Sequence, residues 1–366
     1  MDSKKPERWV RKGVRLMKQG AETPRNCLIL GGGALGLLLH YNLTHAFSEN
    51  GSPTRRVTHS RTTVPEPILF EQATAEALPF QVEYHTGSAQ SCLKIIDPEL
   101  VFICVPPEST EEVLHTWLAA METWGQPKTQ VQIIFCNNGC LSPATLGRIQ
   151  QAHSRFSFLR ALFFVGAMRT IHEDHTVIRW TGGTRVVWDW LRPPLEHRST
   201  ELPNFLSCPA ALASGQSTRT APVKSSAATL GFTEWMRETT IFAAERCKFF
   251  TNFMLAAAVG PQLAKNKTLS ERLEDSIVSH QAQQFAVLWE HHGVTAEQLK
   301  LTLMSTVADT GENINSLSYA AVQGKTGTMA WFLQSLEEDI RRSPRRAKLE
   351  PLISFLSSVR KNWRME

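Results

Sequence analysis

The sequence predicts two regions, an α/β domain with a mainly parallel sheet and then an all-helical domain. In the first half, short and nearly all-apolar runs are bounded by Gly, Pro or Asn, which is typical of strands buried on both faces. A helical pattern at 108–122 (ESTEEVLHTWLAAME) separates two of these runs. From about residue 233 onward, apolar residues recur with helical periodicity through the rest of the chain.

The expected strands of the α/β region are, in chain order, 27–30, 68–70, 101–105, 131–136 and 161–165. Val177–Trp180 and Arg185–Trp188 flank the Thr-Gly-Gly-Thr sequence at 181–184, and this pattern predicts a β-hairpin. The sequence His-Glu-Asp-His at 172–175 contains metal-binding residue types. It is polar and lies between two apolar runs, so we interpret it as a turn.

Residues 189–230 are rich in Pro, Ser, Thr and Ala, which indicates a connector. The helices expected beyond it are 233–258, 271–292, 295–320, 326–342 and 347–362. The pair His291-His292 before Gly293 predicts a helix C-terminus. The expected division of the chain is a basic tail, an α/β domain, a connector and a helical domain, at 1–25, 26–190, 191–230 and 231–366.

Charge and hydropathy exclude some classes of partner. The 366 residues have a net charge of +5, and the first 25 carry eight Lys or Arg against three Asp or Glu, so the remainder is neutral overall. We therefore expect no nucleic-acid partner for the body of the protein. No run approaches the roughly 18 apolar residues of a membrane span, so we expect no membrane insertion.

The basic tail allows two interpretations, a solvated extension or a transit peptide. The expected location is cytoplasmic in the first case and mitochondrial in the second. Several of the seven cysteines lie in apolar runs, which indicates buried, reduced thiols. Because Cys136 and Cys140 have no second pair nearby, we expect no metal site.

A glycine-rich turn follows the first predicted strand. Gly31, Gly33 and Gly36 fit the pattern GxGxxG between that strand and a predicted helix, which is the context of a dinucleotide-binding, Rossmann-like domain. The glycines would allow a tight turn, close approach of a diphosphate and close helix packing. A tight turn without a ligand is the alternative. The expected cofactor contacts here are Gly31, Gly32, Gly33, Ala34, Leu35 and Gly36.

The end of the second predicted strand indicates which dinucleotide would bind. An NAD site usually has a carboxylate there, but residues 54–64 (TRRVTHSRTTV) contain none. Arg55, Arg56 and Arg61 suit a 2′-phosphate instead, which favours NADP, with Arg61 as the expected contact. A basic surface loop is the alternative.

One lysine lies inside an apolar helical pattern. Lys248 and Asn252 are four residues apart in CKFFTNF (247–253), so they share one face of a helix. A lysine facing a cleft near a cofactor would have a lowered pKa and could donate a proton. On spacing alone, a lysine that extends to the surface is the favoured interpretation.

Four segments together resemble the ketopantoate reductase (2-dehydropantoate 2-reductase) family. They are GGGALG at 31–36, the Asn138-Gly139 pair in FCNNGC, CKFFTNF at 247–253 and TGENINSL at 310–317. The resemblance covers most of 26–340 and is weakest at 44–95 and 189–230. It implies an NADP-binding Rossmann-like domain and a helical substrate and catalytic domain of the 6-phosphogluconate dehydrogenase type.

The resemblance also implies a reaction and roles for individual residues. The reaction is NADPH-dependent reduction of ketopantoate to pantoate, a step of pantothenate and coenzyme A biosynthesis. Lys248 would donate the proton to the substrate carbonyl oxygen, and Asn138 would lie between nicotinamide and substrate. The residues expected to hold the acid are Asn252, Asn266, Asn313 and Ser316.

Three positions depart from the family pattern. Ala256 stands where the family has a second asparagine. Thr328 stands where the family has a glutamate near the cofactor, and the resemblance therefore makes Thr328, like Asn138, an expected cofactor contact. Pro106 stands where it commonly has a lysine. These departures leave two alternatives, a reductase of another 2-oxo acid and a catalytically weak NADP-binding protein. The expected partners are a small 2-oxo acid and, as one option, a second copy of the chain.

Overall fold

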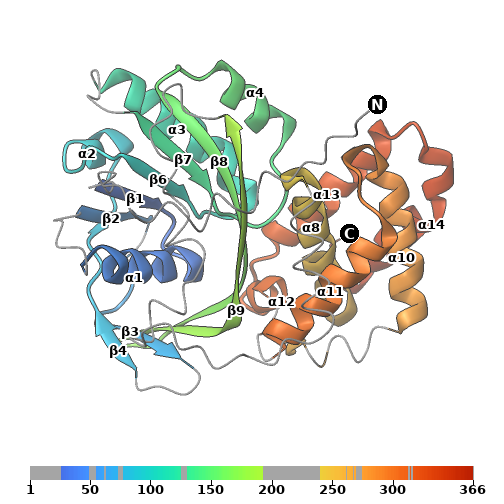
Figure 1. The fold of residues 1–366 in the computed structure, drawn as a ribbon. Coiled ribbons are helices and arrows are strands. Elements are labelled where there is room, and N and C mark those ends of the chain that lie inside the picture. Colours follow the sequence, from blue (N-terminus) through green and yellow to red (C-terminus); the bar gives the residue numbers. More distant parts are fainter. Residues whose placement is uncertain are drawn as a thin grey trace, which may run out of the picture.

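The computed structural model describes residues 26–48, 55–61, 63–72, 77–124, 130–192, 240–260, 262–266, 268, 274–311, 314 and 316–365. The predicted tail at 1–25 and almost all of the predicted connector lie outside these residues. Figure 1 shows a sheet with helices beside a second part made of helices. The predicted combination of an α/β region and an all-helical region is confirmed.

The described strands form one nine-stranded sheet in the order β4-β3-β9-β8-β7-β6-β1-β2-β5. Neighbouring strands are parallel except for the pairs β3–β4 and β8–β9, so the prediction of a mainly parallel sheet is confirmed. The strands are β1 Asn26–Leu30, β2 Arg55–His59, β3 Ile68–Gln72, β4 Leu78–Phe80, β5 Tyr84–His85, β6 Leu100–Ile103, β7 Val131–Phe135, β8 Phe156–Ile171 and β9 Thr176–Arg192.

The first strand is buried on both faces, as its apolar run predicts. Leu28 and Leu30 pack in a cluster that includes Trp117, whereas the alternate residue Ile29 packs in a second cluster with Leu39. Helices therefore cover both faces of the sheet near β1. The helices of this region are α1 Ala34–Ser48, α2 Ala89–Leu93, a short 3₁₀ turn Pro107–Ser109, α3 Thr110–Thr123 and α4 Pro143–Gln151.

The hairpin predicted around residues 181–184 is wrong. β9 continues through these residues and pairs with β8 along its length, with register irregularities beside Gly166 and Gly182. The apolar and β-branched residues on both sides keep pairing with β8, and the glycine is accommodated as an irregularity within the strand. The turn that joins β8 to β9 lies at 172–175, where the His172 amide donates to the His175 carbonyl oxygen at 2.8 Å. The interpretation of that segment as a turn is confirmed.

The helical part consists of α8 Ile241–Val259, α10 Asp275–Leu288, a 3₁₀ turn Glu290–His292, α11 Ala296–Thr310, α12 Ser316–Val322, α13 Gly327–Arg342, a 3₁₀ turn Arg346–Leu349 and α14 Glu350–Asn362. The single helix predicted at 295–320 is wrong, because α11 ends at Thr310 and Ile314 forms an isolated bridge with Lys265 before α12 begins. The C-terminus predicted at His291-His292 is confirmed by the left-handed Gly293 that follows it, with φ of 71°.

Helix α8 forms the centre of the helical part and contacts the sheet. Phe249 and Phe253 lie in the helical core, and Phe249 packs edge-to-face against Trp289. On the sheet side, Ala244 of α8 packs with Leu162 and Phe164 of β8. Figure 1 shows β8 and β9 running between the rest of the sheet and the helices. This packing brings one face of α8 against β8.

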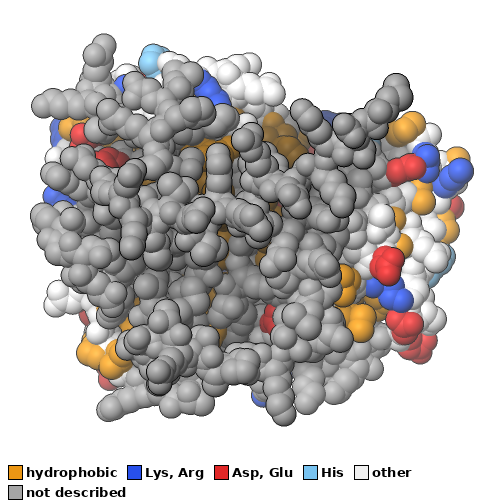
Figure 2. Space-filling model, viewed as in Figure 1, with side chains coloured by type: hydrophobic (Ala, Val, Ile, Leu, Met, Phe, Trp, Pro, Cys, Tyr) orange, Lys and Arg blue, Asp and Glu red, His pale blue; other side chains and the backbone are white. Residues whose placement is uncertain are grey.

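Among the described residues, no helix has the length and apolarity needed to cross a bilayer. In the space-filling view, basic and acidic side chains of the described helical part are interspersed over the visible surface (Figure 2). Surface ion pairs in this part include Arg360 with Glu337, at 2.6 Å between Nη2 and Oε1, and Arg345 with Glu290, also at 2.6 Å.

Candidate functional site

A cavity of about 180 Å³ lies where the sheet meets the helical part. Its lining comes from the start of α1, the loop after β7, the middle of β8, α8, α11 and the segment before α10. The lining residues are Ala34, Leu35, Asn138, Phe163, Phe164, Val165, Ala167, Lys248, Thr251, Asn252, Leu255, Asn266, Thr306 and Thr310. Residues far apart in the sequence, including six of the predicted site residues, therefore line one cavity.

The glycine turn has a shape that suits a diphosphate. Gly31 has φ of 116°, and a Cβ there would lie 3.0 Å from the backbone of Cys104. A Cβ on Gly36 would lie 1.9 Å from the Gly31 carbonyl oxygen, so only glycine lets α1 approach β1 this closely. A Cβ on Gly33 would meet no heavy atom within 4 Å. This open space at the N-terminus of α1 fits an anionic group bound by backbone amides.

The end of β2 has basic and neutral residues. Ser60 lies against the glycine turn, with its Oγ 3.0 Å from the position of a Cβ on Gly32. Arg61 follows with its side chain 84% exposed, and its Nη2 is 3.8 Å from Oε1 of Glu112. An exposed pair of this kind is weak, so the guanidinium is available to a 2′-phosphate.

Lys248 is buried at the sheet-facing side of α8. Its Nζ donates a hydrogen bond to the Phe163 carbonyl oxygen at 2.6 Å and lies 5.5 Å from the centre of the Phe164 ring. Burial, and then the nearby positive charge of Arg160, lower the pKa of Lys248 to about 7. A primary ammonium has three N–H donors, so the Phe163 carbonyl leaves donors for a ligand in the cavity.

Asn266 presents a hydrogen-bond acceptor to the cavity. Its Nδ2 donates at 3.1 Å to both the carbonyl oxygen and the hydroxyl of Thr310. Because a carbonyl oxygen can only accept, this contact fixes which end of the Asn266 amide is nitrogen. Its Oδ1 and the hydroxyl of Thr306 are buried and have no partner among the described residues. Both atoms are therefore candidates for bonds to a ligand.

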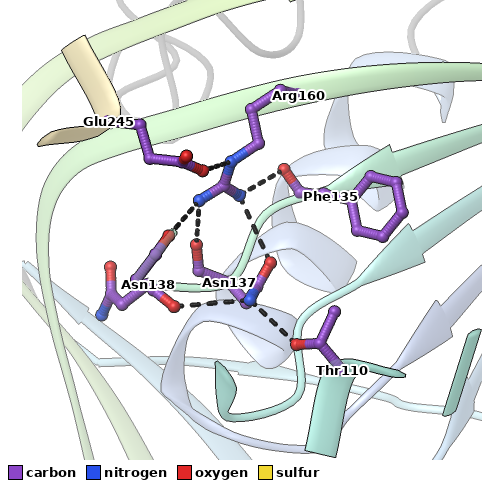
Figure 3. Close-up of polar contacts among 7 residues, drawn as sticks. Thr110, Phe135, Asn137, Asn138, Arg160 and Glu245 are labelled. Atoms are coloured by element: carbon purple, nitrogen blue, oxygen red, sulfur yellow. Dashed lines mark hydrogen bonds and ion pairs between the residues drawn. The ribbon is translucent and has the colours of Figure 1, made fainter. Parts of the chain in front are cut away.

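The Asn138 segment is held by a buried arginine, as Figure 3 shows. Arg160 of β8 is 1% exposed, and its Nε donates to Oε1 of Glu245 on α8 at 2.7 Å. Its two terminal nitrogens donate to Phe135, Asn137 and Gly139. In the same view, the side-chain amide of Asn138 points away from the guanidinium.

Other predicted positions lie elsewhere. Thr328 does not line the cavity, and its hydroxyl donates to Oε1 of Glu108 at 2.9 Å. Asn313 lies outside the described residues, and the side chain of Ser316 is likewise not described. Ala256 is fully buried and Pro106 is exposed. Among the described residues, no group of three or more His, Cys, Asp or Glu could hold a metal ion.

Sequence reasoning missed several residues of this region. Thr306 and Thr310 are four apart on α11, a spacing that could have indicated a polar helix face. Arg160 and Arg169 lay in apolar strand sequence with no local signal of their partners. Arg169 donates a hydrogen bond to the Gly32 carbonyl oxygen of the glycine turn, 137 residues away in the sequence.

No protein-family model matches the sequence, and no curated protein matches it. Among solved structures, a dimeric ketopantoate reductase from Staphylococcus aureus is similar at 14% identity and a TM-score of 0.54, covering 93% of this chain and 99% of that chain. The 2-dehydropantoate 2-reductase from Porphyromonas gingivalis W83 is 11% identical, with a TM-score of 0.48 and coverage of 89% and 99%. Yersinopine dehydrogenase with NADP+ bound is 12% identical, with a TM-score of 0.45 and coverage of 93% and 99%.

The first of these similarities extends over almost the whole of both chains. At 14% identity it establishes a shared fold, and the expected fold type is confirmed. The roles of individual residues depend on the geometry described above.

Proposed function

We propose that this protein is an NADPH-dependent reductase of a 2-oxo acid. The observation that carries the proposal is the position of Lys248 in the cavity that Ala34 and Leu35 of the glycine turn also line. A proton donor and a nucleotide-binding turn at one cavity are the two elements that carbonyl reduction requires. The pKa of Lys248, lowered to about 7 by its burial, suits a group that donates a proton near neutral pH.

The chain's residues fit the cofactor. The open space at Gly33 and the N-terminus of α1 would accept the diphosphate. Arg61 and Ser60, with no carboxylate at the end of β2, would favour a 2′-phosphate over a free ribose hydroxyl. When bound, NADPH supplies the hydride that reduces the substrate carbonyl carbon.

Lys248 is proposed to act as the general acid. Its ammonium would hydrogen-bond to the carbonyl oxygen of the substrate and donate a proton to it as negative charge develops. The hydrogen bond to Phe163 would orient the amine. Fixing these groups before the reaction removes part of its entropic cost.

The polar atoms of the cavity support a substrate with a hydroxyl group as well as a carboxylate. Asn252 and Asn138 offer amides, whereas Asn266 offers an acceptor oxygen that suits a hydroxyl donor. Ketopantoate, a 2-oxo acid with a hydroxyl group, is the specific substrate that we propose. Ala256 lacks the second amide of the related family, and this favours a different 2-oxo acid as the second candidate.

Oxidation of NADPH at 340 nm in the presence of a panel of 2-oxo acids tests this function. We expect turnover with ketopantoate that exceeds turnover with unhydroxylated 2-oxo acids. Turnover with another acid alone would support the second candidate. Binding of NADPH without turnover on any acid of the panel would contradict the enzymatic proposal and leave a nucleotide-binding protein.

The assembly, domain division and location are proposals of the same kind. We propose a homodimer, and the dimeric state of the Staphylococcus aureus ketopantoate reductase, whose fold is similar, supports this expectation. Light scattering after size-exclusion chromatography tests it, since a monomeric mass would contradict it. We also propose the cofactor domain at 26–190, the substrate domain at 231–366 and a cytoplasmic location, with a mitochondrial one as the alternative.

A further inference from the structure

We propose that the buried Arg160–Glu245 ion pair positions the two sides of the reaction site relative to each other. Arg160 fixes the backbone that carries Asn138, and Glu245 fixes the turn of α8 that carries Lys248. Both are positioning residues, because neither lines the cavity. This inference depends on the proposed reductase function for its catalytic meaning.

The hydrogen bonds of Arg160 use the whole guanidinium. Nε donates to Glu245 at 2.7 Å, and Nη1 donates to the Phe135 carbonyl oxygen at 3.0 Å and to Oδ1 of Asn137 at 3.3 Å. Nη2 donates to the carbonyl oxygens of Asn137 at 3.0 Å and Gly139 at 2.7 Å. These bonds match the five N–H donors of arginine in a fixed planar arrangement.

The acceptors of Arg160 lie on both sides of Asn138. Three of them are carbonyl oxygens at alternate positions 135, 137 and 139, so the guanidinium holds the carboxyl end of β7 and the loop after it. Asn137 is also fixed by its Nδ2, which donates to the Thr110 hydroxyl at 2.9 Å. With its neighbours held in this way, the side chain of Asn138, which points away from the guanidinium in Figure 3, has a defined direction, and Asn138 lines the cavity.

The acidic partner lies on the helix that carries the proton donor. Glu245 is three residues before Lys248 on α8, so the two side chains leave the same face of the helix one turn apart. Glu245 is 5% exposed and Arg160 is 1% exposed, so the pair is screened little by solvent. The ion pair therefore connects β8 to α8 directly beside the reaction site.

The pair also contributes to the electrostatic environment of the amine. Three charged or titratable groups act on Lys248, namely Arg160 of β8, Cys136 after β7 and Glu245 of α8. Arg160 lowers the pKa of Lys248, whereas Glu245 raises it. A change of one partner should therefore alter proton donation as well as geometry.

A buried ion pair often adds little to the free energy of folding, so its presence here is not explained by stability alone. Replacing such a pair with apolar residues is often neutral or stabilising, because the charges lose their hydration on burial. A second, partly buried arginine provides a comparison. Arg246, on the next position of α8, pairs with Asp339 at 3.1 Å and lies 5.3 Å from the Trp289 ring, within the helical part.

Two single variants and one control test the proposal. Arg160→Lys keeps the positive charge but loses the planar set of donors, and Glu245→Gln keeps an oxygen acceptor but loses the negative charge. Arg246→Lys is the control. For each variant we would measure thermal unfolding, the Kd of NADPH, kcat, and hydrogen exchange of the segment 136–141 by mass spectrometry.

For Arg160→Lys, we expect faster exchange at 136–141 and a fall in kcat of about 10- to 100-fold, because misplacement of reacting groups is costly. The Kd of NADPH should stay within about threefold, because the pair does not contact the glycine turn. For Glu245→Gln, the alkaline limb of the kcat profile should move to lower pH. Unchanged exchange and unchanged kcat in Arg160→Lys would overturn the proposal, as would equal effects in Arg246→Lys.

A measurement that needs no turnover separates this inference from the proposed function. The rate at which acetic anhydride labels Lys248, followed by mass spectrometry against pH, reports the titration of that amine. We expect the Lys248 amine to titrate at lower pH in Glu245→Gln than in the unaltered protein. In Arg246→Lys it should titrate at the same pH as in the unaltered protein. No difference would overturn the inference. Lack of NADPH oxidation by the unaltered protein would contradict the reductase proposal alone.

A double variant replaces Arg160→Lys in this test if the single variant does not fold. If Arg160→Lys does not fold, the double variant Arg160→Met with Glu245→Met removes both buried charges while keeping side-chain volume. We expect it to fold, to bind NADPH within about threefold and to show the same loss of kcat and faster exchange at 136–141. A double variant with normal kcat would overturn the proposal.

Discussion

Lys248 donates a 2.6 Å hydrogen bond to the carbonyl oxygen of Phe163, and this contact joins the central helix of the helical part to the middle of β8. The amine is held by a strand of the sheet while it faces the cavity. Lys248→Met should lower kcat by about 10²- to 10⁴-fold, since a positioned proton donor contributes that much.

The same substitution should leave the binding of NADPH nearly unchanged, with Kd within about threefold, because Lys248 is not part of the glycine turn. Stopped-flow kinetics and fluorescence titration measure the two quantities. Lys361→Met, at an exposed position of α14, is the matched control and should leave both unchanged. A Lys248→Met variant with a normal kcat would show that another group donates the proton.

The lowered pKa of Lys248 predicts opposite pH dependences of activity and stability. Only the protonated amine donates a proton, so kcat should fall as pH rises above about 7. The amine has a pKa of about 7 when folded and 10.5 in its ordinary state, so between these values the unfolded chain binds more protons. Stability should therefore rise with pH in this window, by up to about 1.4 kcal/mol per pH unit from this group.

Urea unfolding at pH 7.5 and pH 9.5 measures that effect. The free energy of unfolding of Lys248→Met should lack this increase with pH. The change in the free energy of unfolding between the two pH values, compared between the two proteins, therefore gives the contribution of the amine. A pH dependence identical in both proteins would mean that the folded-state pKa of Lys248 is not lowered.

The sequence predicts the parallel sheet well because its evidence is local. β6 is a continuous apolar run, and β1 and β7 each contain a single polar residue; such runs indicate strands wherever they pair. The prediction of a hairpin at 181–184 was wrong because it, too, depended on local evidence alone. The Gly-Gly pair is a local turn signal, but the pairing of β9 with β8 on both sides outweighs it.

The sequence predicts only those residues of the candidate site that have a local signal. Lys248 and Asn252 have a helical spacing that is visible in the sequence, and both line the cavity. Arg160 has no such signal, because its partner Glu245 is 85 residues away. The free acceptor of Asn266 also depends on a distant residue, since Thr310 takes up its amide group. Contacts set by tertiary structure are not visible in local patterns.

The close packing of the glycine turn predicts a large effect of one methyl group. Gly36→Ala would place a Cβ 1.9 Å from the Gly31 carbonyl oxygen, so α1 would have to move away from β1. We expect destabilisation of about 2 kcal/mol or more and loss of NADPH binding. Gly147→Ala in α4 is the control, because a Cβ there meets no atom within 4 Å.

The control variant should be neutral or more stable by up to about 1 kcal/mol, as expected for alanine replacing glycine in a helix. Denaturant unfolding and NADPH titration of both variants measure the difference. Normal NADPH binding by Gly36→Ala would contradict the assignment of this turn as the diphosphate site.

The exposed Arg61 predicts the preference between the two nicotinamide cofactors. Arg61→Ala should raise the Kd of NADPH about 10-fold, since a guanidinium–phosphate contact is charge-assisted, and leave the Kd of NADH unchanged. Arg55→Ala is the control, because the Arg55 guanidinium is already paired with Glu83. Equal changes for NADPH and NADH in Arg61→Ala would remove this residue from the 2′-phosphate site.

The hydroxyl of Thr306 has no partner among the described residues, so we predict that it hydrogen-bonds to the hydroxyl group of the substrate. Thr306→Val keeps the shape of the side chain and removes its one polar atom at the cavity wall. We expect KM for a hydroxylated 2-oxo acid to rise about 5- to 10-fold, the effect of one lost hydrogen bond. KM for the unhydroxylated analogue should stay within about twofold, because it makes no such bond. Steady-state kinetics with this pair of substrates separates the two outcomes, since an equal rise for both would indicate a change of cavity shape alone.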